Sequence, residues 1–256
     1  MLRFAQAPEE SDFSAPIYEI YNSGKRMGAW EYALDWESLP AGEEDDPDDD
    51  PRWVATSLSA HVEQIGLWTA AMLLQKANDF PIRLALAQAA ADEARHAEVF
   101  AKYAIHLYGY IDEVQDDFGN LIRHFRSLKS FDEQFLSHIA LENLALEEFA
   151  LLGGARGCAF LSNIYAMTRR DEARHVAMGI AYFRNRVKQD ASLSGLVRSH
   201  LDRYATLIGV DESGVGWLAD FSGLPADDVG RRINARQARL AELILSKTAT
   251  PEDLDG

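Results

Sequence analysis

The chain has 256 residues, which is enough for one large domain with its own core or for two small ones. It carries 25 Lys and Arg against 41 Asp and Glu, a formal net charge of -16, which argues against nucleic acid or an anionic membrane as its partner. Its single cysteine, Cys158, excludes an intramolecular disulfide and four-thiolate zinc or iron–sulfur sites. No stretch resembles a signal peptide or a membrane span, so we expect a soluble cytoplasmic protein.

The first segment, residues 1–51, is rich in helix-breaking prolines and in aromatic residues. We expect an extended or partly helical arm that packs its aromatic side chains on the main body. Within it, Glu43–Asp50 reads EEDDPDDD, an acidic block that is typical of a solvated loop. The block lacks the Gly and the terminal Glu of an EF-hand, which disfavours calcium binding.

Four long helices are predicted between residues 53 and 188, because apolar residues recur every three or four positions and proline is almost absent. A shorter amphipathic helix, Asp112–Phe125, would connect the second to the third. The long helices are expected at residues 53–78, 81–108, 131–152 and 159–188.

Helical periodicity returns at residues 192–208 and 226–246, with residues 209–217 and the loop around Pro225 as separators. We expect the last helix to cover the bundle or to join a second subunit. No β-hairpin or phosphate-binding loop is predicted. The sequence thus predicts an all-α protein with an arm at 1–51, a four-helix core at 52–190, and C-terminal helices at 191–256 packed on the same domain.

One pentapeptide, Asp-Glu-Ala-Arg-His, occurs twice, at Asp92–His96 and at Asp171–His175. Each copy contains a Glu-x-x-His pair, and each has another glutamate thirty residues before its own. Adding 79 to the residue numbers of one set gives the other. The candidate metal ligands are Glu63, Glu93, His96, Glu142, Glu172 and His175.

The thirty-residue spacing predicts two helical hairpins. On one straight helix, thirty residues span about 45 Å, so two such glutamates share a metal only if the chain folds back between them. The first midpoint, residue 78, falls in the break Asn78–Pro81, where proline favours a new helix start. The second midpoint, Gly157, ends a glycine-rich interruption. Both turns therefore bring the glutamates of a pair to the same height.

The residue types favour two metal ions. Positions i and i+3 share a helix face, so each Glu-x-x-His pair can hold one ion. Each upstream glutamate can either bridge two ions or bind one terminally. Four carboxylates with two imidazoles suit iron or manganese, and their charge of -4 would be neutralised by two divalent cations. Surface salt bridges on amphipathic helices are the alternative, which the doubled, evenly spaced pattern disfavours.

This doubled pattern resembles the ferritin-like di-iron carboxylate proteins over about residues 53–188. The Asp-Glu-x-Arg-His form is similar to the di-iron oxygenase branch, including bacterial multicomponent monooxygenases and relatives of the ribonucleotide reductase small subunit. The resemblance implies a ferritin-like four-helix bundle with additional helices, holding two Fe ions, with Mn or mixed Fe/Mn also open. It further implies O2 as co-substrate, a reductase or ferredoxin as electron donor, and a small organic substrate. We also expect a homodimer.

The resemblance also assigns residues around the ligands. Asp92 and Asp171 would orient the ligand imidazoles across the bundle, and Arg95 and Arg174 would support the charged network. Phe100 stands where the reductase subunit has its radical tyrosine, so a radical generator of that design is not expected. In aminoarene N-oxygenases an additional histidine ligand lies one turn before the last Glu-x-x-His. That position is Thr168 here, which weakens the match to those enzymes.

The reaction stays open between hydroxylation, N-oxygenation, desaturation and oxidative cleavage. Two other classes compete with an oxygenase. A ferroxidase or storage protein would use the same ligands but release ferric iron, and a metal-free structural bundle would use them for salt bridges.

Several further residues have two interpretations. His138, one turn before Glu142, could reach the site, but a structural or exposed role is favoured because its counterpart is Ser59. Glu147 could turn inward at a π-bulge, but a solvated face is favoured. Small and apolar residues next to the ligands either leave a water-poor pocket beside the metals or allow tight helix packing. They include Gly66, Ala89, Ala145 and Gly179. Tyr103 and Tyr182 are expected to be packed rather than redox-active.

Overall fold

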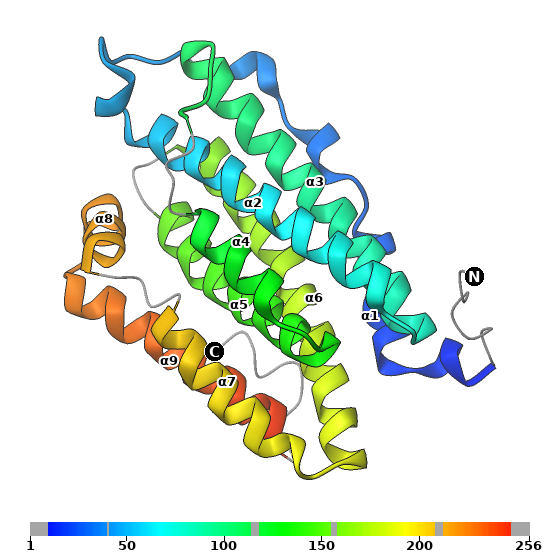
Figure 1. The fold of residues 1–256 in the computed structure, drawn as a ribbon. Helices are drawn as coiled ribbons and strands as arrows, with labels where there is room; N and C mark the ends of the chain where they lie inside the picture. The colour runs from blue at the N-terminus through cyan, green and yellow to red at the C-terminus, as the bar shows by residue number, and fades with distance from the viewer. Residues whose placement is uncertain (1–9, 40, 114–117, 155–157, 208–211, 247–256) are drawn as a thin grey trace.

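The structure is a computed structural model that describes residues 10–39, 41–113, 118–154, 158–207 and 212–246 (Figure 1). Its regular elements within these ranges are all helical, which confirms the predicted class. Short 3-10 turns flank the single described α-helix of the N-terminal arm. The α-helices are α1 Pro16–Met27, α2 Pro51–Lys76, α3 Phe80–Tyr108, α4 Phe118–Ser127, α5 Phe131–Gly154, α6 Ala159–Gln189, α7 Leu193–Leu207, α8 Glu212–Ser222 and α9 Ala226–Leu245.

The helices α2 and α3 form the first predicted hairpin and pack along each other (Figure 1). The turn lies at residues 77–79, so the predicted midpoint is confirmed. Asp79 caps the second helix, because its carboxylate accepts a hydrogen bond from the backbone N–H of Ile82 at 3.0 Å. Gly109 ends that helix with a φ of 86°, a left-handed conformation that glycine adopts without strain.

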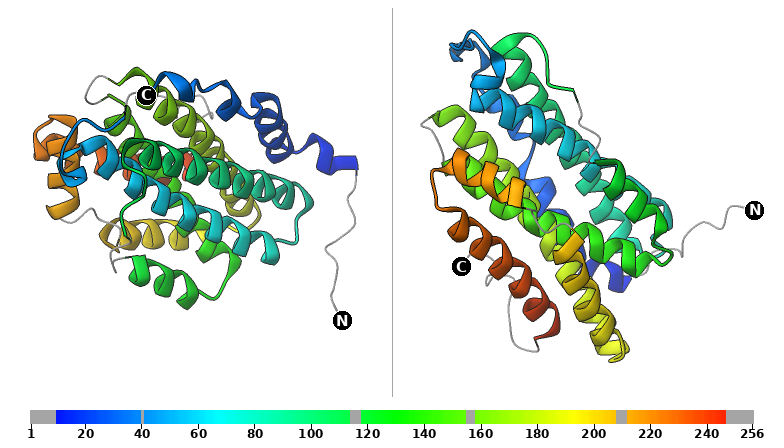
Figure 2. Two further views of the ribbon diagram at one scale, coloured as in Figure 1. Left: turned by 90° about the horizontal axis from the view of Figure 1, so that it is seen from above. Right: turned by 60° about the vertical axis from the view of Figure 1, so that its left-hand side comes forward.

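The helices α5 and α6 form the second hairpin. The third long helix ends at Gly154 and the fourth begins at Ala159, close to the predicted bounds. The predicted midpoint, Gly157, lies outside the described residues. The two hairpins lie side by side with their helices roughly parallel to one long direction (Figures 1 and 2).

The N-terminal arm lies along one side of the bundle, where α1 packs on α3 and α6 (Figures 1 and 2). Trp30 is buried there, as expected for the aromatic residues of the arm, whereas Tyr32 is 86% exposed. The acidic block is a solvated loop up to residue 49, at one end of the molecule. Its last residue, Asp50, is buried and caps α2 by accepting from the backbone N–H of Arg52 at 2.9 Å.

Two connecting elements differ from the prediction. The helix expected at Asp112–Phe125 begins at Phe118. At Asp112 the backbone bonds to side chains of α2 instead of continuing a helix: His61 Nε2 lies 2.8 Å from the carbonyl oxygen of Asp112, and the Asp112 N–H donates to Ser57 at 3.2 Å.

None of the described helices has the length and apolarity to cross a bilayer.

The separator expected at residues 209–217 is partly wrong, because α8 begins at Glu212. Gly214 and Gly216 lie in its first turns, but Leu218 and Phe221 are buried and Trp217 packs at 5.7 Å from the Phe221 ring. Tertiary packing outweighs the weak helix propensity of glycine here.

The last helix, α9, covers the bundle, as one of the two expectations had it. It packs on α5 and α6. Gln237 donates to the carbonyl oxygen of Ala140 at 2.9 Å, and Arg232 and Arg236 pair with Glu147 at 2.6 and 3.1 Å. Glu147 is therefore buried toward this helix, and the predicted solvated face is wrong.

The core consists of two apolar clusters at different heights of the bundle. One contains Leu73, Leu86, Phe135 and Phe183. The other contains residues from the opposite ends of the same helices: Trp53, Phe100, Phe149 and Tyr165. On each long helix the candidate ligands fall between the two clusters. The fold thus places a polar layer between two water-excluding apolar layers.

Glycine at 179 lets α5 and α6 approach closely, since a Cβ there would overlap the side chain of Ile139. We expect Gly179→Ala to destabilise the protein by about 1–3 kcal/mol, the usual cost of overpacking. Gly230→Ala is the control, because no atom lies within 4 Å of its Cβ position in α9. It should stabilise by about 0.5–1 kcal/mol. Chemical denaturation measures both, and an equal effect of the two substitutions would contradict the close approach.

Candidate metal centre

The structure brings all six candidate ligands together in the middle of the bundle. The two hairpins contribute equally. Helix α2 carries Glu63 and α5 carries Glu142, while α3 and α6 each carry a Glu-x-x-His pair. None of the six side chains belongs to a residue more than 5% exposed. Four carboxylates and two imidazoles are therefore buried in one place.

These side chains form two overlapping sets, within each of which the ligand atoms lie within 4.8 Å of one another. One set is Glu63, Glu93, His96 and Glu172, and the other is Glu93, Glu142, Glu172 and His175. The glutamates of the two Glu-x-x-His pairs belong to both sets, so their carboxylates can bridge two ions. Glu63 and Glu142 each belong to one set only. Of the two predicted alternatives, bridging two ions or binding one terminally, the arrangement therefore favours terminal binding for both.

The imidazole of His96 faces the carboxylates with one nitrogen and an aspartate with the other. Its Nδ1 lies 3.1 Å from Glu63 Oε2 and 3.1 Å from Glu172 Oε1. Its Nε2 lies 3.2 Å from Asp171 Oδ2. The ionised aspartate accepts a hydrogen bond from Nε2–H, so that with a metal ion bound a neutral imidazole would present its Nδ1 lone pair on the side of the glutamates.

The imidazole of His175 repeats this arrangement in the other half. Its Nδ1 lies 3.0 Å from Glu93 Oε1 and 3.3 Å from Glu142 Oε2. Its Nε2 lies 3.4 Å from Asp92 Oδ2. Each aspartate therefore reaches the histidine of the opposite pentapeptide, which is the cross-bundle pairing that the family resemblance implied.

Two arginines neutralise the two aspartates. Arg95 lies 2.9 Å from Asp171 and also contacts Asp92, while Arg174 lies 2.8 Å from Asp92 and 2.6 Å from Asp171. Burial would raise the pKa of both aspartates, but hydrogen bonds from the histidines and the nearby positive charges hold it well below the ordinary value. Both carboxylates are thus ionised acceptors at neutral pH.

Trp30 is a site residue that sequence reasoning missed. Its indole N–H donates to Asp171 Oδ2 at 2.8 Å, its ring stacks at 6.2 Å from the ring of His96, and Arg95 lies over it at 5.7 Å. The arm thereby closes one side of the site. No sequence spacing marks this contact, because 141 residues separate the donor from the acceptor.

The buried glutamates resist ionisation when no cation is present. Burial raises the pKa of Glu63 to about 8, and the charge of Glu142 adds to the rise. Burial and repulsion between carboxylates raise the pKa of Glu93 and Glu172 well above the ordinary value. These carboxyls therefore hold protons at neutral pH that a metal ion would displace.

The two histidines also gain protons. Burial alone would lower the pKa of His96, but hydrogen bonds to Asp171 and Glu172 raise it to about 9. For His175, burial is outweighed by the charge of Glu172 and by hydrogen bonds to Asp92 and Glu142, which raise the pKa well above its ordinary value. Protons thus supply, in the metal-free protein, part of the positive charge that the carboxylates need.

Two further observations fit a metal pair. Glu93 Oε1 and Glu172 Oε1 are buried and accept no hydrogen bond in the described part of the chain, although each lies within 3.1 Å of an imidazole nitrogen. Buried oxygens without hydrogen bonds are costly unless another ligand binds them. In addition, a Cβ at Gly66 would overlap the Glu93 carboxylate, so glycine makes room for the shared ligand.

His138 contacts the site, which corrects the favoured interpretation that it is structural or exposed. It is fully buried, and its Nδ1 lies 3.0 Å from Glu142 Oε1 and 3.0 Å from Thr69 Oγ1. Burial would raise the pKa of Glu142, but the charge of His138 and the hydrogen bonds with Glu172, His138 and His175 together outweigh it, and the pKa lies well below the ordinary value. A histidine one turn before a glutamate ligand was the signal.

The tyrosines are packed, as expected. Tyr103 lies 3.3 Å from the thiol of Cys158, and Tyr182 donates to Asp132 at 2.6 Å. The space beside Gly66 and Gly179 is filled by the side chains of Glu93 and Ile139. At these two glycines the structure therefore shows tight packing and not a pocket beside the metals.

Known proteins resemble this chain in fold. No protein-family model matches the sequence, and no curated protein matches it significantly. A solved structure of a variant R2-like ligand-binding oxidase, reconstituted aerobically with a Mn/Fe cofactor, is 17% identical with a TM-score of 0.72, covering 97% of this chain and 99% of that one. The chain has the R2-like fold.

Two further structures agree with that fold. A variant reconstituted anaerobically with a Mn/Fe cofactor is 17% identical with a TM-score of 0.70, covering 93% of this chain and 96% of the other. A third, with an aerobically reconstituted metal cofactor after photoconversion, is 17% identical with a TM-score of 0.69, covering 93% and 95%. At this identity the likeness concerns the fold, and it confirms the predicted ferritin-like architecture with additional helices.

The raised pKa values give the metal-free protein a characteristic pH dependence. The pKa of Glu63 is raised from 4.5 to about 8 in the folded chain, and the pKa of His96 from 6.5 to about 9. A raised pKa means that the folded state binds more protons than the unfolded state. Each such group therefore stabilises the folded state at low pH, and this contribution is lost as the pH rises toward the folded-state pKa. We expect the unfolding temperature of the chelator-treated protein to fall between pH 5 and 9. Metal reconstitution should abolish this fall, and a rise over the same window would contradict the protonated site.

Proposed function

We propose that the protein is an O2-dependent oxidase with a carboxylate-bridged pair of metal ions, which oxidises a small organic substrate. The observation that carries the proposal is the sharing of Glu93 and Glu172 between two buried ligand sets. A mononuclear site or a salt-bridged structural bundle has no need to bury four carboxylates around one point. The charge of -4 matches two divalent cations.

The metals that suit these ligands are iron and manganese, since carboxylate and imidazole donors in a closed site favour neither soft nor alkaline-earth ions. The R2-like structures with Mn/Fe cofactors support a mixed Mn/Fe pair as an alternative to a di-iron pair. In its reduced form such a pair supplies the electrons and the open coordination positions for O2 chemistry. Glu63 with His96 would complete one position, and Glu142 with His175 the other.

The protein's own residues orient and insulate the site. Asp171 and Asp92 fix the imidazole rings so that Nδ1 faces the glutamates, and the two arginines keep these aspartates ionised. His138 holds one oxygen of Glu142 at 3.0 Å, which leaves the other oxygen facing His175. The apolar clusters above and below exclude water, which protects reactive species from side reactions.

The reaction subtype follows from the substrate, and hydroxylation, N-oxygenation, desaturation and oxidative cleavage all belong to the proposal. Reduction of O2 requires electrons from outside the chain, and a reductase or ferredoxin is the proposed donor. A homodimer is the proposed assembly.

The shared and terminal glutamates should differ in what their removal does. After anaerobic reconstitution with Fe(II) and Mn(II), we expect about two ions per chain, measured by elemental analysis. Glu142→Ala and Glu63→Ala each remove a donor from one set only, so each should retain about one ion and lose O2 consumption. Glu93→Ala and Glu172→Ala remove a donor from both sets and should retain fewer.

Glu98→Gln is the matched control, because Glu98 is an exposed glutamate of the same helix as Glu93. It should retain both ions and full O2 uptake by the reduced protein. Two bound ions and unchanged O2 uptake in Glu142→Ala would contradict the proposal. Iron loading far above two per chain would indicate a ferroxidase or storage protein instead.

A further inference from the structure

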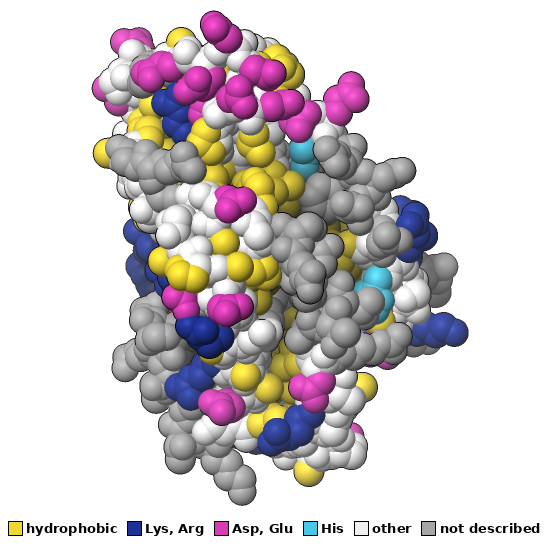
Figure 3. All heavy atoms as spheres, turned by 90° about the vertical axis from the view of Figure 1, so that its left-hand side faces the viewer, with side chains coloured by type: hydrophobic (Ala, Val, Ile, Leu, Met, Phe, Trp, Pro, Cys, Tyr) yellow, Lys and Arg dark blue, Asp and Glu magenta, His cyan; other side chains and the backbone are white. Residues whose placement is uncertain are grey.

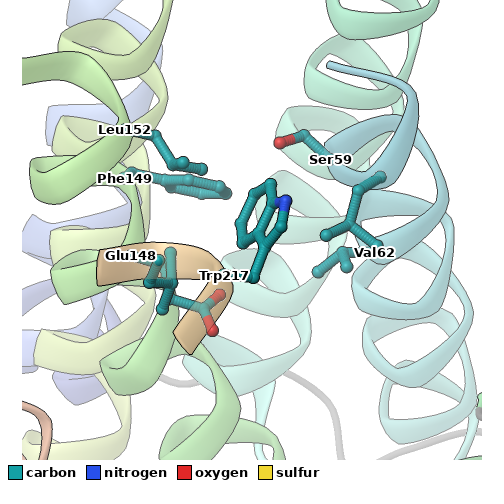
Figure 4. Close-up of a pocket in the computed structure, with 8 residues that line it drawn as sticks. Ser59, Val62, Glu148, Phe149, Leu152 and Trp217 are labelled. Carbon is teal, nitrogen blue, oxygen red and sulfur yellow. The ribbon is translucent and has the colours of Figure 1, made fainter. Parts of the chain in front are cut away.

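A cavity of about 120 Å³ lies between α2, α5 and α8, apart from the metal ligands (Figure 4). Its walls are mainly apolar, with Val62 on one side and Phe149 and Leu152 on the other, and Trp217 of α8 lies between them. One carboxyl group, that of Glu148, also lines it. The cavity thus combines an apolar body with a single acidic group.

The carboxylate of Glu148 has no hydrogen-bond or ion-pair partner among the described residues. The preceding residue, Glu147, points the other way and pairs with Arg232 and Arg236. The hydroxyl of Ser59 is paired with the phenol of Tyr165 at 3.1 Å. The remaining polar group of the lining, the indole N–H of Trp217, is an uncharged donor. Glu148 is therefore the charged group of the cavity that is available to a ligand.

The surroundings of Glu148 make its ionised form costly. Its side chain is half-buried, and the loss of contact with water raises its pKa to about 7. The described lining residues of α2 and α8 contain no titratable group. The phenol of Tyr165, on α6, interacts electrostatically with Glu148, but burial raises its pKa far enough to keep it neutral. No cation of the described chain offsets the charge, so a cationic ligand would gain most from it.

We propose that this cavity binds a small organic amine, whose ammonium group pairs with Glu148 and whose apolar body packs on Trp217 and Phe149. A carboxylate ligand would be repelled by Glu148, and a neutral ligand would leave its charge uncompensated. The two aromatic rings add attraction for a cation.

Size and long-range charge agree with such a ligand. The volume is somewhat below the roughly 150 Å³ of a protein cavity that holds benzene, so a single ring would fill it and an aminomethyl group would lie at the half-buried carboxyl of Glu148. The net charge of -16 attracts cations toward the protein. The face of the molecule on the side of α8 shows acidic side chains gathered at its upper end (Figure 3).

The cavity also lies next to the metal centre along α2. Val62, which lines it, precedes the candidate ligand Glu63, and Ser59 lies one turn earlier. Tyr165 interacts electrostatically with both Glu63 and Glu148. The amine would thus be the substrate class of the oxidase. That assignment rests on the proposed function, whereas the binding site itself does not.

Calorimetry with three nearly isosteric probes tests the site: benzylamine, benzyl alcohol and benzoate, each titrated at pH 8 into the metal-loaded full-length protein. At this pH Glu148 is largely ionised and a primary amine is protonated. We expect benzylamine to bind about tenfold more tightly than benzyl alcohol, and benzoate not to bind. Glu148→Gln should weaken benzylamine about tenfold and leave benzyl alcohol unchanged.

Two variants support the comparison. Glu98→Gln removes one negative charge from the exposed surface and should leave benzylamine binding unchanged. Leu58→Trp fills the cavity from its partly exposed rim and should abolish binding of both benzylamine and benzyl alcohol.

Equal affinity for amine and alcohol, tighter binding of benzoate, or no effect of Glu148→Gln would each overturn the inference. Metal content measured on the same samples separates the two proposals. Two ions per chain without benzylamine binding would overturn the amine site alone. Benzylamine binding that depends on Glu148, without a metal pair, would overturn the oxidase alone.

Discussion

Mutual repulsion among four buried carboxylates is the constraint on which the structure depends. Glu63, Glu93, Glu142 and Glu172 lie between two apolar clusters, where water cannot screen their charges. The folded chain tolerates this only with positive charge in the same layer, supplied by protons on the metal-free site or by cations. A purely structural bundle would avoid such a layer, because hydrophobic residues of similar volume would stabilise it at least as well.

Successive groups of opposite charge surround these carboxylates and compensate their repulsion. Imidazoles separate the carboxylates from Asp92 and Asp171, and Arg95 and Arg174 then neutralise those aspartates. Trp30 and the arm cover the arginine side, where the side chains of Arg95 and Arg174 are only 12% and 11% exposed. The cavity with Glu148 is different, because its carboxyl has no such neutralising neighbour among the described residues.

Much of the fold and of the candidate site could be predicted because it depends on spacing within helices. Glu93 and His96 share a face by helix geometry, and the thirty-residue interval required a turn near residue 78. Contacts between elements were less accessible. The hydrogen bond of Trp30 to Asp171 and the burial of Glu147 against α9 depend on how distant segments pack, which no local periodicity encodes.

The crosswise pairing of the two pentapeptides has a further consequence for symmetry. Asp92 reaches His175 and Asp171 reaches His96, while Arg95 reaches Asp171 and Arg174 reaches Asp92. Reciprocal contacts of this kind define an isologous interface, the type formed by two identical subunits about a twofold axis. The hairpins behave as such a dimer within one chain. Neither can complete a metal position alone, and a change in one repeat acts on the imidazole of the other.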